Sequence, residues 1–583
     1  MEGDIVSLYR AILAKEKGTI KKDWGGKLSI ALAYPSFYRL GMSNLGFQVV
    51  YQIFNKRSDI VAERVFLPED GEMSLYVQSG KTLLSLESQR PLQDFDVLAF
   101  SLCFENDYLN ILKILDLAKM PLLSEHRADN YPLVVAGGVT TFLNPEPIAP
   151  FIDFFLIGEA EANLEDFLDL LIEAGSGSRS EMIRYLAVNA KGLYAPSLYK
   201  PEYHENGLLS SFEPQAPGVP EKIDSALWTP SRKVVTQSLI TTPETEFGDK
   251  VLMELNRGCG RACRFCAAGY VYRPPREYHM EDLQESIGKA LGTGHSLGLV
   301  GTALSDVHGI EELTNRIIRN KGRFSISSLR ADALTKGLVE SLQQAGQKTV
   351  SIAPEAGSER LRKVANKHLA EEQILDAVTL IASVGDFSIR LYFLIGLPTE
   401  KREDIHGIVS LVKSIKHRMV KESAPRGRMG HIRLSVNCFV PKPFTPFQWF
   451  PLETVSSLKE KQKWLKKGLV KEGGIKVTSD LPKWAYIQTL LSIGDRRVAS
   501  ILMKAHESGG DWTKALRFSE VNPDFFVYRP KALDEMLPWD FIDHGIRKEH
   551  LIKEYRLALE AKESDICRVG ECNRCGACGS TRC

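Results

Sequence analysis

Short apolar segments alternate with helix-type segments over most of the chain, and this alternation restricts the possible folds more than any other feature. The first series of such strand-like segments lies at 28–35, 96–102, 132–138 and 153–159. Continuous apolar strands separated by helices predict a parallel sheet that is covered on both faces. We therefore expect an N-terminal helix over 1–25 and a Rossmann-like domain over 26–199.

A second series begins after residues 200–245, which are rich in proline and polar residues and predict an extended linker. Its strand-like segments lie at 251–255, 296–300, 323–328, 348–353, 387–395 and 432–440. Six strand–helix steps favour a (β/α)6 partial TIM barrel over 246–450. A helical C-terminal region over 451–560 and a cysteine-rich tail over 561–583 complete the prediction, so the expected fold class is α/β.

Composition narrows the class of protein and its surroundings. The 583 residues are 44% hydrophobic and carry a net charge of +1, so we expect sizeable cores and no global attraction to nucleic acid or membranes. No apolar run is long enough to span a bilayer, and the first residues lack the continuous apolar stretch of a secretory signal. We expect a cytoplasmic location, where ten cysteines suggest metal or redox chemistry rather than disulfides.

Three of the cysteines form a compact motif in the segment NRGCGRACRFCAAGY. Cys259, Cys263 and Cys266 follow the first barrel strand directly, where barrel enzymes place their chemistry. Three thiolates can each bind one iron of a [4Fe–4S] cluster, and a cluster normally takes four. No fourth cysteine is near, so one iron would stay open to an outside ligand, as in catalytic metal sites. The alternative is a zinc-binding or redox-inert cysteine loop.

With Phe265 before its last cysteine, the CxxxCxxC motif resembles that of the radical S-adenosylmethionine (SAM) superfamily. The resemblance implies that the open iron binds the amino and carboxylate groups of SAM. One electron then cleaves SAM to methionine and a 5′-deoxyadenosyl radical, which removes a hydrogen atom from the substrate. An electron donor such as flavodoxin or ferredoxin is therefore an implied partner.

Further segments support this resemblance and suggest contacts with SAM. SSLRADAL ends the third barrel strand, and the resemblance implies that Ser327 and Arg330 contact the ribose and the carboxylate of SAM. In APEAGSERLR, Glu355 is a candidate hydrogen-bond partner of SAM, and in LIGLP the backbone near Gly396 is expected to contact adenine. The alternative for Arg330 and Glu355 is a structural ion pair at the barrel rim.

A Rossmann-like domain ahead of such a barrel resembles the cobalamin-binding subgroup of the radical SAM superfamily. Ligands of open parallel sheets sit at the carboxyl ends of the strands, where small residues let a large planar ligand approach. The candidate cobalamin contacts in this part of the chain are Ser43, Ser101, Gly137, Gly138, Gly158 and Glu159. The DxHxxG motif of many cobalamin domains is missing, and His126 lies in SEHRAD, so we expect no histidine below the cobalt. The alternative is a degenerate domain that only positions substrate.

The remaining cysteines divide into a second candidate metal site and two buried residues. Cys567, Cys572, Cys575 and Cys578 offer four thiolates in the tail, which suit either zinc or a second iron–sulfur cluster. Cys583 is spare. Cys103 and Cys438 stand alone in apolar strands and are expected to be core residues.

Five other segments have a distinctive composition or resemble segments of other proteins. The basic stretches 416–433 and 458–471 suit either an RNA phosphate backbone or, more commonly, a solvated face. The aromatic segment 440–450 is expected to pack against the barrel mouth. Together with 492–500 and 537–543, it resembles segments of uncharacterised cobalamin-type radical SAM proteins.

Three functions are compatible with these observations. The first is cobalamin-dependent methyl transfer or a related C–H functionalisation, because cobalamin beside a radical generator favours that chemistry. The second is a cobalamin-independent radical SAM enzyme, such as one that inserts sulfur into RNA. The third is a non-enzymatic iron–sulfur or zinc RNA-binding protein, which would not need the open three-cysteine site. The sequence indicates no catalytic nucleophile or general base, and no particular substrate.

Overall fold

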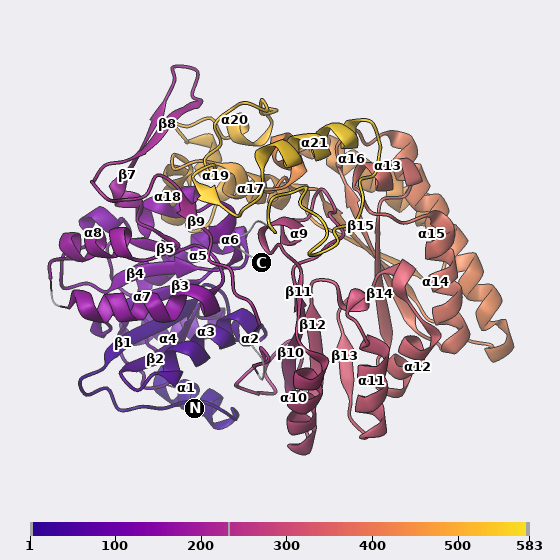
Figure 1. The fold of residues 1–583 in the computed structure, drawn as a ribbon, viewed down its shortest axis with the longest axis horizontal. Coiled ribbons are helices and arrows are strands. Elements are labelled where there is room, and N and C mark those ends of the chain that lie inside the picture. The colour runs from indigo at the N-terminus through magenta and orange to yellow at the C-terminus, as the bar shows by residue number, and fades with distance from the viewer. Residues whose placement is uncertain (1–3, 176, 231–233, 579–583) are drawn as a thin grey trace.

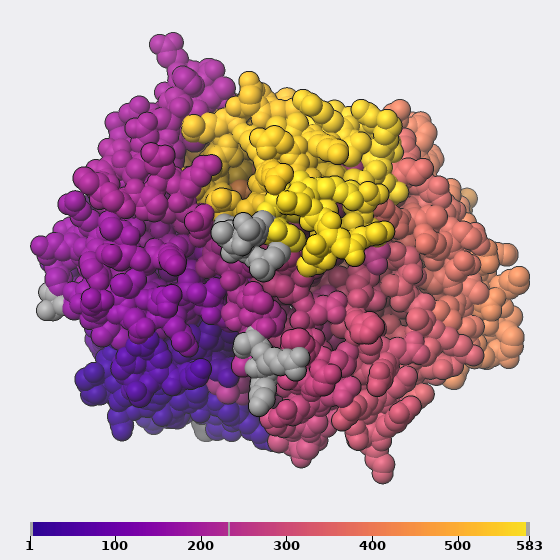
Figure 2. All heavy atoms as spheres, in the orientation of Figure 1, coloured from indigo at the N-terminus to yellow at the C-terminus, as the bar shows by residue number. Residues whose placement is uncertain are grey.

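The computed structural model describes residues 4–175, 177–230 and 234–578. Figure 1 shows two sheet systems side by side, with the C-terminal region lying over the ends of both. The space-filling view shows the same region covering the boundary between the N-terminal domain and the barrel (Figure 2). Among the described residues, no helix combines the length and the apolar character that a membrane crossing requires.

The N-terminal sheet has the strand order β2-β1-β3-β4-β5-β6, with only β6 antiparallel to its neighbour. Its strands are β1 (Leu28–Tyr34), β2 (Ile60–Phe66), β3 (Val97–Ser101), β4 (Leu133–Gly137), β5 (Phe154–Leu156) and β6 (Leu193–Tyr194). The predicted Rossmann-like sheet is therefore confirmed, with β2 and β6 added to the four expected strands. Strand order reverses between β1 and β3, and such a switch point opens a crevice at the carboxyl ends.

Helices cover both faces of this sheet (Figure 1). They are α1 (Ile5–Ala14), α2 (Tyr38–Met42), α3 (Leu45–Lys56), α4 (Asp70–Ser79), α5 (Tyr108–Leu117), α6 (Val139–Leu143), α7 (Ala160–Ala174) and α8 (Arg179–Asn189). Helix α3 begins directly after Asn44, whose side chain accepts a hydrogen bond from the Phe47 amide at 2.9 Å. Helices α3 and α7 contact each other and flank the crevice.

The barrel has seven parallel strands rather than six. They are β10 (Lys250–Arg257), β12 (Ser296–Gly301), β13 (Phe324–Ile326), β14 (Thr349–Glu355), β15 (Ser388–Ile395), β16 (Ile432–Cys438) and β17 (Ile475–Ser479). A parallel bridge between Leu329 and Ile352 joins β13 to β14, and β11 (Arg276–Glu277) pairs antiparallel with β10. Strand β17 lies within residues 451–560, which are otherwise mainly helical, as the sequence predicts.

All the barrel crossovers place their helices on one face of the sheet, because the strand order follows the chain in one direction. The helices are α9 (Ala268–Val271), α10 (Met280–Gly292), α11 (Ile310–Arg319), α12 (Lys336–Gln344), α13 (Glu359–Val364), α14 (Glu371–Val384), α15 (Arg402–Ser423) and α16 (Val455–Leu469). In β15, Ile389, Leu391 and Phe393 are fully buried, whereas the alternate positions are half-buried. One face thus packs under the helices, and the other faces the barrel lumen.

The last described part of the chain ties the two sheet systems together. It contains α17 (Pro482–Ile493), α18 (Val498–Glu507), α19 (Trp512–Arg517), α20 (Pro523–Val527), α21 (Lys548–Leu559) and β18 (Ile542–Asp543), which pairs with β9 (Ile223–Asp224). Arg496 pairs with Glu146 of the N-terminal domain at 3.1 Å, and Trp539 donates to Gln448 at 2.8 Å. The segments 492–500 and 537–543 therefore have a structural role, because they hold the C-terminal region against the rest of the protein.

Residues 200–245 contain more structure than the linker that the sequence predicts. Strands β7 (Tyr199–Tyr203) and β8 (Leu209–Pro214) form an antiparallel hairpin that projects from the molecule in Figure 1. Further along, Gln237 forms an antiparallel bridge with Met253 of β10. This part of the chain thus extends from the N-terminal domain onto the edge of the barrel.

Candidate cofactor sites

The three cysteines of the motif lie on the loop between β10 and α9. The loop begins at Gly258, where φ is +79° and a Cβ would lie 2.3 Å from the Tyr272 carbonyl oxygen, so only glycine fits. The Arg261 amide donates to Cys259 Sγ at 3.4 Å. Burial raises the pKa of Cys266 to about 12, and the neighbouring Cys263 and Cys259 add to the shift. The three sulfurs therefore influence one another electrostatically, and iron would have to displace their protons on binding.

Among the described residues, no three His, Cys, Asp or Glu side chains are grouped tightly enough to hold a metal ion. Each cysteine of a [4Fe–4S] cluster binds a different iron, so cluster ligands stand farther apart than the ligands of a single ion. Three cysteines on one loop, without a fourth, match the donor set of a cluster with one open iron.

Arg264 is a residue of this loop that sequence reasoning missed. Its side chain is fully buried, and Nε donates to Glu554 Oε2 of α21 at 3.0 Å. The guanidinium also donates to three backbone carbonyls, those of Lys363 (3.0 Å), Val364 (3.1 Å) and Lys562 (2.9 Å). Arg264 therefore fastens the cysteine loop to α13 and to the C-terminal helix.

Arg330 and Glu355 lie at the barrel rim but do not pair with each other. The Arg330 guanidinium donates to both oxygens of Asp332 at 2.9 Å and to the Lys367 carbonyl at 3.1 Å. Glu355, at φ +66°, accepts from Lys367 Nζ at 3.1 Å. Lys367 also lies in the electrostatic range of Cys263, whose nearby sulfur helps raise the pKa of this lysine. Both predicted SAM contacts thus bind Lys367, Arg330 through the lysine's backbone carbonyl and Glu355 through its amine.

The other two predicted SAM contacts differ in exposure. Ser327 is exposed just beyond β13. Gly396 is buried at φ +83°, and its amide donates to Glu400 Oε2 at 2.7 Å, so this amide is already used within the protein. Burial raises the pKa of Glu400 to about 7, although Lys461 Nζ lies 2.6 Å away. The roles of all four residues towards SAM stay predictions.

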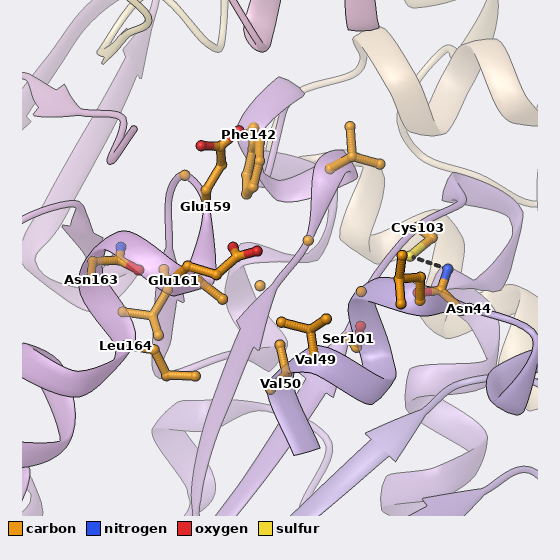
Figure 3. Close-up of a pocket in the computed structure, with 18 of the residues that line it drawn as sticks. Asn44, Val49, Val50, Ser101, Cys103, Phe142, Glu159, Glu161, Asn163 and Leu164 are labelled. Carbon is orange, nitrogen blue, oxygen red and sulfur yellow. Dashed lines mark hydrogen bonds between the residues drawn. The ribbon is translucent and has the colours of Figure 1, made fainter. Parts of the chain in front are cut away.

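A cavity of about 620 Å³ opens where the N-terminal sheet meets the barrel (Figure 3). Strand ends of β3, β4 and β5 form one side, and helices α3 and α7 extend it over the sheet. Glu254 of β10 and Val300 of β12 line the barrel side. Five of the six residues predicted for cobalamin line this cavity, namely Ser101, Gly137, Gly138, Gly158 and Glu159. Ser43 does not line it, and its hydroxyl donates to the Arg39 carbonyl.

Three of the glycines that line the cavity are predicted cobalamin contacts, and two of these three are required by the fold itself. A Cβ on Gly138 would lie 2.3 Å from the Leu102 carbonyl oxygen, and one on Gly158 would lie 2.3 Å from the backbone of Ala226. Both residues also have positive φ. A Cβ on Gly137 would have Leu156 O as its nearest neighbour at 3.7 Å. Of these three glycines, Gly137 is therefore the one where the lack of a side chain leaves room for a ligand.

Glu159, a predicted cobalamin contact, is held by the protein itself, whereas Asn163, which the sequence did not single out, has no partner among the described residues. The Glu159 carboxylate accepts hydrogen bonds from Arg276 at 2.6 and 2.8 Å and from the Trp228 amide at 2.6 Å. Its role is therefore structural. Asn163, on α7, is only 4% exposed, and neither atom of its amide has a hydrogen-bond partner in the described chain. A buried amide without partners is unfavourable, and a polar ligand group in the cavity would satisfy it.

No histidine lines the cavity, and His126 lies apart with its side chain 64% exposed. Cys103, expected as a core residue, is instead half-buried in the cavity wall, where Asn44 Nδ2 donates to its sulfur at 3.2 Å (Figure 3). Cys438 is 6% exposed, and burial raises its pKa to about 12, as a core thiol requires. The prediction for Cys438 is confirmed, whereas Cys103 packs against the core and also lines the cavity.

The cysteine-rich tail folds back onto the cysteine loop of the barrel. The Cys567 amide donates to the Gly260 carbonyl at 2.8 Å, and Cys575 is 4% exposed. Burial raises the pKa of Cys567, and Cys575 and Cys572 contribute to this shift. Arg273 faces both Cys567 and Cys575. At least three of the four predicted tail ligands are therefore neighbours, while Cys583 lies outside the described residues.

The basic and aromatic segments belong to the barrel. The stretch 458–471 lies mainly in α16, with Leu458 and Leu465 buried and Lys461 paired with Glu400 and Glu453. In 416–433, Lys416 pairs with Glu472. In the aromatic segment 440–450, Phe447 packs with Leu397 and Phe439, and Phe265 of the cysteine loop lies against the same cluster. The predicted packing of 440–450 at the barrel mouth is confirmed.

Comparison with known proteins agrees with this architecture. Residues 46–196 match the family "Radical SAM proteins, N-terminal", and residues 253–412 match the family "Radical SAM superfamily". The uncharacterized protein MJ0966 of Methanocaldococcus jannaschii is 30% identical over 479 residues, which are 81% of this chain and 90% of that protein. A tRNA-2-methylthio-N(6)-dimethylallyladenosine synthase of Clostridium botulinum is 22% identical over 181 residues, which are 29% of this chain and 40% of that protein.

Two solved structures resemble the chain in fold. TsrM from Kitasatospora setae with cobalamin and a [4Fe–4S] cluster bound is 13% identical, with a TM-score of 0.46 over 73% of this chain and 74% of that one. OxsB with aqua-cobalamin and S-adenosylmethionine bound is 14% identical, with a TM-score of 0.46 over 92% and 79%.

A parallel barrel that carries a CxxxCxxC loop on its first strand defines an enzyme of the radical SAM class, whose core cofactors are a [4Fe–4S] cluster and SAM. The chain belongs to the radical SAM superfamily, in the same family as MJ0966 of Methanocaldococcus jannaschii.

Proposed function

We propose that this enzyme binds cobalamin in the cavity beside its radical SAM site and methylates, or otherwise functionalises, an unactivated C–H bond of its substrate. The observation that supports the proposal is the cavity of about 620 Å³, because one space joins the strand ends of the N-terminal sheet to the barrel. Gly137 and Ser101 line one side of this space, and Glu254 and Val300 line the other. A ligand of the N-terminal domain would therefore face the barrel directly.

The chain's residues around the cysteine loop have distinct tasks in this proposal. The cluster with its bound SAM supplies the radical that removes hydrogen. Cys259, Cys263 and Cys266 would each hold one iron of the cluster, and Arg264 fixes their loop against α21 through Glu554. The loop's other arginine, Arg261, pairs with Asp306 at 2.6 Å. The apolar cluster around Phe265 keeps water away from the reacting atoms.

The cavity has the chemistry that a cobalamin needs. Aliphatic side chains from α3 and α7, such as Val49, Val50 and Leu164, suit the apolar faces of the macrocycle (Figure 3). The unpartnered amide of Asn163 is complementary to the carboxamide groups at the cofactor's rim. Of the described residues that line the cavity, none is a histidine, so the lining would offer a bound cobalamin no imidazole. When bound, the cobalamin would supply the methyl group.

We further propose that Cys567, Cys572, Cys575 and Cys578 hold a second metal centre, either zinc or an iron–sulfur cluster. The support is their shared environment, since Cys567 interacts electrostatically with Cys572 and Cys575 and Arg273 faces two of the thiols. A closed site would fix the tail against the cysteine loop. Sulfur insertion into RNA without cobalamin is the second candidate function, because a second cluster beside the first would suit it.

Anaerobic reconstitution with iron, sulfide and cobalamin tests the first function. We expect about one cobalamin per chain, and 5′-deoxyadenosine after addition of reductant and SAM. Cys263→Ala should abolish 5′-deoxyadenosine. Gly137→Val should lower cobalamin binding about tenfold or more while the cluster remains, because the new side chain fills cavity space without a backbone clash.

Gly288→Val is the matched control, because Gly288 lies on the outer helix α10 with no atom within 4 Å of its added Cβ. Full cobalamin binding by Gly137→Val would refute the site. 5′-Deoxyadenosine without cobalamin in the wild-type enzyme would refute methyl transfer and favour the second candidate. Full 5′-deoxyadenosine formation by Cys263→Ala would refute the radical mechanism itself.

A further inference from the structure

The inner face of the barrel carries three positively charged side chains side by side. Arg390 of β15 is the register partner of Arg433 of β16, and Arg433 is the register partner of Lys476 of β17. Neighbouring strands lie about 4.8 Å apart, so the three side chains form one row across three strands. Ser351 of β14 continues the row beside Arg390.

The alternation of each strand places this row on the lumen side. Leu391 of β15 and Leu434 of β16, one residue further along their strands, are 0% exposed under the helices that cover the outer face. Arg433 and Lys476 are exposed and Arg390 is half-buried, so solvent reaches the row. The side chains therefore lie in the lumen rather than in the core.

No negative charge balances the row in the described part of the chain. The side chains of Arg390, Arg433 and Lys476 make no hydrogen bond or ion pair with the described residues. The only carboxylates on β10 and β12–β17 are Glu254, which pairs with Arg257, and Glu355, which pairs with Lys367. Among the described residues, no carboxylate therefore forms an ion pair with the side chains of the row.

A fourth cation lies on the inner face of the opposite strands. Lys250 of β10 donates from Nζ to Ser325 Oγ at 2.9 Å, and burial lowers the pKa of this lysine. Around the row itself, the inner positions of the neighbouring strands hold Tyr392, Ser435 and Asn437. Closed TIM barrels fill their interior with valine, isoleucine and leucine. This lumen instead carries polar and positively charged side chains on both sides.

Like charges on adjacent strands repel, so such a row is unfavourable unless a ligand neutralises it. Two guanidinium groups one strand apart match the geometry of an oxyanion, because each presents a planar fork of donors. We propose that the barrel lumen binds an oxyanion group of the substrate, a phosphate or a carboxylate, between Arg390 and Arg433, with Lys476 at the open edge.

This assignment rests on the proposed function, since it places the substrate of the radical reaction, and it defines the substrate's shape. From Arg390 to Leu394 at the rim the strand rises roughly 13 Å at about 3.3 Å per residue. The reacting carbon must lie near the rim, where the cysteine loop is. The substrate is therefore an elongated small molecule with an anionic end, and the anion lies deep in the lumen.

Direct binding to the reconstituted enzyme, without SAM or reductant, tests the site independently of catalysis. Inorganic phosphate and glutarate serve as probes in calorimetric titrations at low ionic strength, because salt screens such contacts. We expect saturable binding of at least one probe, weakened about tenfold by Arg390→Gln or Arg433→Gln and abolished by the double variant. Arg319→Gln, on the outer helix α11, removes the same charge and should leave affinity unchanged within about twofold.

A second measurement uses the wild-type enzyme and so avoids any folding defect of the variants. The stronger probe should protect Arg390 and Arg433, but not Arg319, from modification by phenylglyoxal, as read by peptide mass spectrometry. Tighter phosphate would indicate a phosphate ester as substrate, and tighter glutarate a carboxylic acid. Absence of saturable binding, binding unchanged in the double variant, or binding of RNA alone would overturn the proposal whether or not cobalamin is bound.

Discussion

The buried pair between Arg264 and Glu554 predicts how firmly the cysteine loop is held. Glu554→Gln keeps the shape of the side chain but removes its charge. Arg264 is 0% exposed and Glu554 is 3% exposed, so water cannot replace the lost partner. The change should therefore loosen the contact between the loop and α21 without creating a cavity.

The magnitude follows from the contacts that remain. Removing one partner of a buried ion pair costs about 3–5 kcal/mol. Arg264 keeps three backbone carbonyl acceptors after the substitution, so we expect the lower end, about 3 kcal/mol. Since about 1.4 kcal/mol is a factor of ten, local opening of the loop should become roughly 100-fold more frequent.

Release of iron to a chelator under anaerobic conditions measures that opening. The rate should rise roughly 100-fold in Glu554→Gln when release proceeds through local opening of the loop. Glu549→Gln is the control, because Glu549 lies exposed on the same helix and loses the same charge. Equal release rates in the two variants would show that the Arg264 contact does not hold the loop.

Three further predictions concern the tail, a buried lysine and the cavity wall. Cys575→Ser should remove the tail metal but leave the barrel cluster, and unchanged iron and zinc per chain would contradict the tail site. Burial lowers the pKa of Lys531 to about 7, so between pH 7 and 10.5 the unfolded chain binds more protons and stability rises with pH, by about 1.4 kcal/mol per unit. Lys531→Met should flatten this rise in melting temperature, and an unchanged slope would contradict it. Gly138→Ala should destabilise by roughly 1–3 kcal/mol because its Cβ meets Leu102, whereas Gly137→Ala should not, and equal melting temperatures would refute this contrast.

Local patterns in the sequence predicted most of the fold. Apolar runs such as 387–395 identify buried strands because both faces or one full face of each strand are covered. Strand β17 escaped this reasoning, since its residues are at most half-buried and its inner positions are Lys476 and Thr478. Without β17, the basic stretch 458–471 gave no sign that it forms the barrel crossover helix α16.

The site was predicted where chemistry is local and missed where partners are distant in sequence. The cysteine spacing lies within eight residues, so its meaning is visible in one segment. Arg264 acquires its role from Glu554, 290 residues away, and Asn163 acquires its role from a cavity that forms between two domains. A charged residue between two cysteines carries no local sign that it will be buried.

The contact between Gly260 and Cys567 has a consequence for biosynthesis. Roughly 300 residues separate the two, so at about 5–20 residues per second a ribosome needs on the order of 15–60 s to make the tail after the loop. During that interval the barrel can fold while its cysteines lack the cover that the tail later provides. Oxygen and competing metals therefore have their best access to this enzyme before its synthesis is complete, and slow translation between Gly260 and Cys567 would lengthen that exposure.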